Sequence, residues 1–173
     1  AAQQVEEAVH IAHEHRLVMP LLWTVWISGL VCIGKGEYDA ALMKLEQHLA
    51  FSEKVGAEVI SLRVLNTLGW LWIEFDNHTR ALDMNNRSAD GARKRGDPET
   101  FANANINLAD LLLAQGKLPE AQEVTEETYR MVKHPATSDW MRWRYSTHLF
   151  STMGDLSLVC GNPAKAREWA DQC

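Results

Sequence analysis

The feature that most constrains the fold of this sequence is a short segment that recurs four times. Each copy is a turn followed by the start of a predicted helix, with an alanine at the same place. Successive copies are 40, 40 and 45 residues apart, counted between Ala41, Ala81, Ala121 and Ala166. Self-similarity at such a period is typical of solenoids, in which each repeat packs on its neighbours. The recurrence therefore predicts an array of similar units.

A small residue stands twelve positions before each of these alanines, namely Gly29, Gly69, Ala109 and Gly154. Two antiparallel helices approach closely only where their side chains are small. Glycine costs about 1 kcal/mol relative to alanine in a helix interior, so three glycines at this place indicate a packing demand. We expect each repeat to be a helix pair in which Gly69 contacts Ala81 and Ala109 contacts Ala121.

Capping residues agree with this spacing. Asp97 followed by proline is typical of an N-cap and first turn, and Asn162 followed by proline repeats the pattern. Gly56 and Gly96 follow helical stretches and predict their C-terminal ends. No long alternation of polarity predicts a strand. The predicted fold class is all-α: a right-handed superhelix of antiparallel helix pairs, with about nine helices.

The expected domain organisation is a single solenoid over 1–173. Helix pairs are predicted at 18–55, 57–95, 97–133 and 138–173. Residues 3–16 are predicted to be a lone second helix, so we expect the chain to be a fragment of a longer solenoid. The five additional residues of the last period are assigned to the loop 134–138.

The small residue followed by Gly-x-x-x-x-Ala resembles the tetratricopeptide repeat (TPR). The clearest copies are Leu68-Gly69…Ala81 and Leu108-Ala109…Gly116-Lys-Leu-Pro-Glu-Ala121. The period of 40 exceeds the usual value of about 34 and is similar to a longer-helix variety found in large bacterial signalling proteins. The resemblance implies a TPR-like stack. HEAT and armadillo repeats have a similar period but lack the small-residue pair.

A narrower likeness concerns the C-terminal part of the chain. Trp140-Met-Arg-Trp-Arg-Tyr-Ser146, Gly154-Asp-Leu and Gly161-Asn-Pro-Ala-Lys-Ala-Arg167 resemble the C-terminal repeats of multidomain bacterial ATPase-type regulators, some of which carry a nucleotide cyclase. The phosphate-loop motif G-x-x-x-x-G-K-[ST] does not occur in the sequence. The likeness implies a place within a larger regulatory protein.

Composition limits the function classes. The net charge of −6 opposes nucleic-acid binding, which requires a basic face. Three cysteines without a C-x-x-C pair indicate a reducing cytoplasm (Cys32, Cys160 and Cys173). The uncharged segment 17–33 is at the lower length limit of a membrane span and contains Pro20 and Gly29. We expect a cytoplasmic protein that binds neither nucleic acid nor membrane.

The histidines near the start of the chain are the candidate for a metal site. His10, His13 and Glu14 share a helix face, but the motif H-E-x-x-H is absent, so a polar helix face is the preferred interpretation. No nucleophile with a base and an orienting group can be assigned. Catalysis also favours a pocket that excludes water, whereas a solenoid offers an open surface. We expect no enzyme activity, cofactor or metal.

The resemblance to TPR proteins implies a binding groove lined by the first helix of each pair. Transferred by register, its candidate residues are Trp23, Trp26, Arg63, Asn66, Trp70, Asn103, Asn107, Asp110 and His148. The three asparagines are expected to face one another. Amide side chains both donate and accept hydrogen bonds and can bind the backbone of an extended peptide. A solvated polar face is the alternative. Trp72 and Trp169 are predicted to lie in the core.

The predicted function is a protein- or peptide-binding scaffold that uses this groove within a larger bacterial signalling or regulatory protein. The alternative is a sensor domain of a transcriptional regulator that binds a sugar or peptide. A closed pocket flanked by Trp70 and Arg144 would favour the sensor, and an open groove the scaffold. The apolar residues Val5, Val9 and Ile11 of the lone helix predict a homodimer through the N-terminal end.

Overall fold

A computed structural model describes residues 2–173, and the described chain consists of nine α-helices without a strand. It is an all-α solenoid, as predicted. The helices are α1 (Ala2–Glu14), α2 (Val18–Gly34), α3 (Tyr38–Lys54), α4 (Glu58–Glu74), α5 (His78–Arg95), α6 (Pro98–Ala114), α7 (Leu118–Lys133), α8 (Asp139–Val159) and α9 (Pro163–Ala170).

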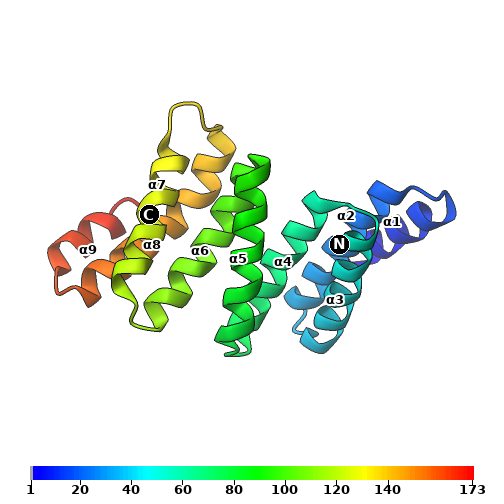
Figure 1. The fold of residues 1–173 in the computed structure, drawn as a ribbon, viewed down its shortest axis with the longest axis horizontal. Coiled ribbons are helices and arrows are strands. Elements are labelled where there is room, and N and C mark those ends of the chain that lie inside the picture. Colours follow the sequence, from blue (N-terminus) through cyan, green and yellow to red (C-terminus); the bar gives the residue numbers. More distant parts are fainter. Residues whose placement is uncertain (1) are drawn as a thin grey trace.

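The helices succeed one another along the long axis of the molecule, with α1 to α3 at one end and α9 at the other (Figure 1). Each helix packs against the next one in the chain. The first helices of the pairs also contact one another, α2 with α4, α4 with α6 and α6 with α8. Over the described residues, the second helices α3, α5 and α7 make no such mutual contacts. The first helices therefore form a continuous inner layer.

The turns between helices recur every twenty residues from the first turn to the sixth. A residue with left-handed backbone stands at each of them, with φ between 54° and 77°: Arg16, Gly36, Gly56, Asp76, Gly96 and Gly116. Four are glycine, which adopts this conformation without a steric cost. The period is interrupted only at the loop between α7 and α8, which lies at 134–138 as predicted.

The core runs along the solenoid between the two helix layers. The repeated alanines are all buried, three of them completely. Leu22, Leu45 and Leu68 belong to one cluster that extends from α2 into α6. A second cluster joins Tyr145 and Leu149 of α8 to the far side of α6. Successive repeats therefore share their apolar contacts.

The two tryptophans predicted to lie in the core do so to different degrees. Trp72 is buried, with its ring edge-on to Phe75. Trp169 is half-buried and stacks on Phe150 with ring centroids 5.9 Å apart. Both rings fill space between neighbouring helices, which is the wedge role expected for large aromatic side chains.

The space beside Gly29 and Gly69 is filled by side chains that stand beyond the repeated alanines, while the contact between Gly69 and Ala81 stays a prediction. A Cβ atom added to Gly69 would lie 2.3 Å from Nδ2 of Asn85, and one added to Gly29 would lie 2.6 Å from the Leu45 side chain. Each of these partners stands four residues after the alanine, one helical turn further. A helical side chain covers the turn that precedes its own Cα, so these longer side chains reach back into the space that glycine leaves.

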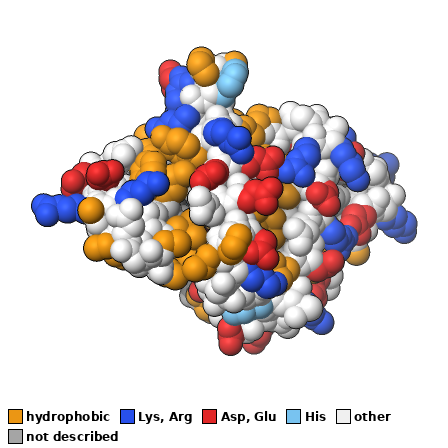
Figure 2. All heavy atoms as spheres, turned by 60° about the vertical axis from the view of Figure 1, so that its left-hand side comes forward, with side chains coloured by type: hydrophobic (Ala, Val, Ile, Leu, Met, Phe, Trp, Pro, Cys, Tyr) orange, Lys and Arg blue, Asp and Glu red, His pale blue; other side chains and the backbone are white. Residues whose placement is uncertain are grey.

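The surface of the solenoid carries charges of both signs. Acidic and basic side chains are interspersed on the face shown in Figure 2. The uncharged segment 17–33 forms most of α2, which packs on α1, α3 and α4. Across residues 2–173, no helix has the length and apolar character needed to cross a membrane.

Candidate groove site

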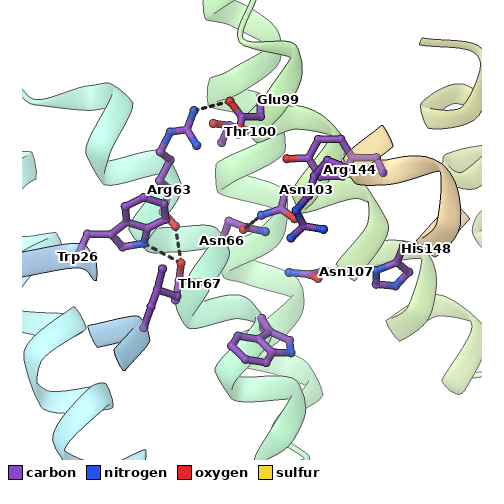
Figure 3. A pocket seen from close by; sticks show the side chains of 13 residues that line it. Trp26, Arg63, Asn66, Thr67, Glu99, Thr100, Asn103, Asn107, Arg144 and His148 are labelled. Carbon is purple, nitrogen blue, oxygen red and sulfur yellow. Dashed lines mark hydrogen bonds and ion pairs between the residues drawn. The ribbon is translucent and has the colours of Figure 1, made fainter. Parts of the chain in front are cut away.

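A cavity of about 420 Å³ opens on the inner layer and spans four first helices (Figure 3). α2 and α4 supply its apolar and aromatic wall, and α6 and α8 supply most of its polar groups. Its lining residues are Trp26, Leu30, Arg63, Asn66, Thr67, Trp70, Glu99, Thr100, Asn103, Asn107, Arg144, Tyr145 and His148. The exposed side chains of Trp70, Arg144 and His148 leave the cavity open to solvent.

Seven of the nine candidate residues line this cavity: Trp26, Arg63, Asn66, Trp70, Asn103, Asn107 and His148. Trp23 and Asp110 do not. The Trp23 ring instead packs edge-on against Trp26, with centroids 5.6 Å apart. The Asp110 carboxylate accepts a hydrogen bond from Thr152 and also lies beside the His148 ring. The structure thus brings most of the set together, and its role in binding a ligand stays a prediction.

A chain of asparagine amides forms the floor of the cavity. Asn103 Nδ2 donates to Asn66 Oδ1, and Asn66 Nδ2 donates to Asn85 Oδ1 at 3.2 Å. Asn107 Nδ2 donates to the same Asn85 oxygen at 3.0 Å. The expectation that the three groove asparagines face one another is therefore met only between Asn66 and Asn103. Asn107 joins them through Asn85, because Gly69 admits that side chain from α5.

Not all of these amides are available to a ligand. Asn66 is almost completely buried, and both ends of its side chain are used inside the network. Asn103 and Asn107 are half-buried and use one amide proton each. Their side-chain oxygens accept no hydrogen bond from residues 2–173. These two residues therefore keep hydrogen-bonding capacity on the cavity side.

Arg63 is held in place on one wall of the cavity. Its Nη2 donates to Glu99 Oε2 at 3.0 Å, which joins α4 to α6. Its guanidinium carbon lies 5.4 Å from the centre of the Trp23 ring and 5.9 Å from that of Trp26. A cation over an aromatic face is attracted by the ring quadrupole. Trp26 is fixed in turn by a 2.9 Å hydrogen bond from Nε1 to Thr67 Oγ1.

His148 and Tyr145 are the α8 residues of the cavity whose neighbours determine what they can bind. His148 Nε2 lies 2.8 Å from Asp110 Oδ2, and Thr152 Oγ1 donates to Asp110 Oδ1 at 2.9 Å. These bonds tie α6 to α8. Burial raises the pKa of Tyr145 to about 12, and the charge of Glu99 adds to the effect. The Tyr145 hydroxyl therefore stays protonated at neutral pH and can act as a donor.

Glu99, Thr100 and Tyr145 also line the cavity, although they are not among the residues predicted for the groove. Glu99 and Arg144 hold equivalent positions in successive first helices, 45 residues apart, as do Thr100 and Tyr145. That is the spacing of the last two repeats, so the repeat spacing alone could have predicted that these residues hold equivalent positions. These residues were missed because the transferred positions on α6 and α8 begin at Asn103 and His148, one turn later than the cavity does.

The histidine-rich face of α1 contains an ion pair at most. His10 Nε2 lies 3.8 Å from Glu14 Oε2, and both side chains are largely exposed. In the part of the chain that the structure describes, no three His, Cys, Asp or Glu side chains gather in a way that could hold a metal ion.

Comparison with known proteins agrees with the repeat architecture. The tetratricopeptide repeat family matches residues 102–127, in α6 and α7. The crystal structure of BtubC (BKLC) from P. vanneervenii has a TM-score of 0.72 and 18% identity; the match covers 88% of this chain and 61% of that chain. This chain therefore spans less than two thirds of that protein. No curated protein matches the sequence. The chain is a TPR-like helical repeat protein.

Proposed function

We propose that this chain is a peptide-binding scaffold and that the cavity on its inner layer holds an extended segment of a partner protein. The observation that carries the proposal is the composition of that cavity. Aromatic side chains of α2 and α4 face partly free amides of α6 across a single opening. Aromatic residues supply apolar contact area, and amides can pair with a peptide backbone. TPR-like stacks commonly serve as interaction scaffolds.

We propose that the chain belongs to a larger bacterial signalling protein, as the likeness of 140–167 to regulator repeats implies. Its role there is binding and not catalysis. The non-catalytic role is supported by the cavity, which is open to solvent along its rim, whereas catalysis gains most from a site that excludes water.

A pair of tryptophan substitutions tests the location of the site. Trp70 lines the cavity and has 38% of its surface exposed, so Trp70→Ala removes a contact surface without opening the core. Trp143 is 71% exposed, lies outside the cavity and serves as the matched control. Partner proteins captured from a lysate of the source organism should be lost with Trp70→Ala and kept with Trp143→Ala. Equal capture by both variants would move the site elsewhere.

A second candidate function is the binding of a small molecule such as a sugar. It is favoured by two observations: the cavity volume lies in the range of small-molecule sites, and Trp70 and Arg144 flank the opening. The exposed rim favours the peptide instead. Calorimetric titration with a panel of mono- and disaccharides separates the two, because a sugar site would give saturable heat that Trp70→Ala abolishes.

A further inference from the structure

A second, smaller cavity lies between α2 and α3 and shares no lining residue with the groove site. Its volume is about 210 Å³. Leu21, Leu22 and Val25 of α2 and Phe51 of α3 form its apolar wall. A dry apolar cavity of about 150 Å³ holds benzene, so this cavity suits an apolar body of about six carbon atoms together with a polar group.

The polar part of the cavity begins with Lys44, which occupies a position that is apolar in the next two repeats. The residues forty and eighty positions later are Met84 and Val124, and both pack on the core. Ser28, which accepts a 3.1 Å hydrogen bond from Lys44 Nζ, likewise stands where the next repeat has the buried Leu68. The first repeat therefore has a cation and a hydroxyl where the fold itself requires only apolar packing.

The Lys44 ammonium group has no carboxylate partner in the described chain. Its Nζ donates to Ser28 Oγ at 3.1 Å and to Cys32 Sγ at 3.5 Å. Among the lysines of residues 2–173, only Lys35 lies within 4.0 Å of a carboxylate oxygen, that of Glu37. Lys44 is half-buried, and a cation partly withdrawn from water is stabilised by an anion beside it. An ammonium group has three donor hydrogens, so one remains for a ligand.

His48 is the second polar group of the cavity wall. It stands one helical turn after Lys44, so the two side chains share a face of α3. His48 is only 4% exposed, and its Nε2 has no hydrogen-bond partner in residues 2–173. Buried polar atoms of proteins nearly always have such a partner. In the tautomer with a proton on Nε2, this nitrogen donates to an oxygen atom placed between it and Lys44.

We propose that the cavity between α2 and α3 binds a small monocarboxylate with an apolar body of about six carbon atoms. The carboxylate lies between Lys44 and His48, and the apolar body packs on Leu21, Val25 and Phe51. An inorganic anion would satisfy the cation but would leave this apolar wall uncovered. The site is a further binding function, beyond the peptide scaffold proposed above.

Titration of the isotope-labelled 173-residue chain, followed by nuclear magnetic resonance, tests the proposal with hexanoate, hexanol and acetate. Hexanoate should shift amide signals of α2 and α3 around the cavity. We expect it to bind about tenfold more tightly than hexanol, which lacks the charge. It should also bind more tightly than acetate, which lacks the apolar body.

Variants of α3 assign the two halves of the ligand to their partners. Lys44→Met places in the first repeat the residue found at the equivalent Met84, so the helices should form as before. It should abolish the preference for hexanoate over hexanol. Lys54→Met is the matched control, because Lys54 is an exposed lysine of the same helix outside the cavity wall. It should keep the preference. Phe51→Ala removes apolar wall and should weaken the binding of hexanoate and hexanol alike.

Each part of the proposal has an outcome that would overturn it. Equal affinity for hexanoate and hexanol, or a preference that survives Lys44→Met, would overturn the role of Lys44. Acetate binding as tightly as hexanoate would overturn the apolar body. Signal shifts confined to helices other than α2 and α3, or no shift with hexanoate, would overturn the site. Because the two cavities share no residue, none of these results bears on the peptide groove.

Discussion

At the scale of single residues, Asn85 connects the packing of the solenoid to the candidate site. It is completely buried on α5, where its Nδ2 donates to the Ala81 carbonyl at 2.9 Å. Its oxygen accepts from Asn66 and Asn107, which belong to the floor of the cavity. The space for this side chain exists because residue 69 is glycine. A buried polar group without its partners is costly, so Gly69, Asn85, Asn66 and Asn107 depend on one another.

This dependence predicts the effect of a methyl group at Gly69. Gly69→Ala would place Cβ 2.3 Å from Asn85 Nδ2 and should lower the free energy of unfolding by about 1–3 kcal/mol through overpacking. Gly154→Ala is the control, because the nearest neighbour of its Cβ would lie 3.8 Å away. That variant should gain up to about 1 kcal/mol from helix propensity. Urea denaturation measures both. Equal stability changes would contradict the packing described.

His48 predicts a dependence of stability on pH. Burial lowers its pKa below 6.5, and its Nε2 has no hydrogen-bond partner in the described chain. Below pH 6.5 the unfolded chain binds a proton that the folded chain resists, so stability is present above pH 6.5 and is lost as the pH falls. The free energy of unfolding should therefore decrease between about pH 7.5 and 5.5.

A serine at the same position isolates this contribution from the other histidines. Ser88 stands forty residues after His48, at the equivalent place of the next repeat, where it is buried and donates to the Leu62 carbonyl at 2.8 Å. A serine is therefore compatible with this place in the repeat, and His48→Ser should show a shallower decrease in stability over the same pH range. An unchanged slope would show that other groups cause the decrease.

At the scale of helices, the sequence predicted much of the structure. Predicted helix ends lie within three residues of those observed, because glycine turns and caps such as Asp97 mark them directly. The side-chain partners across helices were harder to predict. The repeated alanine suggested Ala81 opposite Gly69, whereas the longer Asn85 fills that space. Arg63 of α4 pairs with Glu99 of α6 because the two helices pack side by side, and no pattern within either helix predicts this pair.

The turn between α4 and α5 is one of two turns in the described chain whose left-handed residue is not glycine, the other being the turn at Arg16. Asp76 has φ 55° where neighbouring turns have glycine. Asp76→Gly should therefore stabilise the chain by about 0.5–1 kcal/mol, after the greater entropy of unfolded glycine is deducted. Its exposed contact with His78 contributes little. Asp76→Ala removes the same carboxylate without easing the backbone, so thermal unfolding should show a gain only for glycine.

At the scale of the whole molecule, the N-terminal end of the solenoid exposes several large apolar side chains. Ile11, Leu17, Val18 and Met19 lie around the turn between α1 and α2, each with about half of its side chain exposed. Contiguous apolar surface of this kind favours association, and two-fold pairing buries it with the fewest copies. The predicted homodimer therefore remains the expectation for concentrated solutions.

Sedimentation equilibrium tests this association. The average mass should rise above 19.6 kDa with increasing concentration, and Met19→Glu should hold it at that value. Met43→Glu is the control, because Met43 is equally exposed but lies on α3. A mass that stays at the monomer value in the unmodified chain would contradict the prediction.

The twenty-residue spacing of the turns has a consequence for how such a chain can change in length. A block such as 57–96 begins and ends at equivalent points of the backbone, since a left-handed residue precedes it and another closes it. Unequal exchange within the gene could duplicate or delete the block and leave every turn intact. Each added block would contribute one more first helix to the groove. The longest ligand that the groove accommodates would then grow in whole steps, one helix pair at a time.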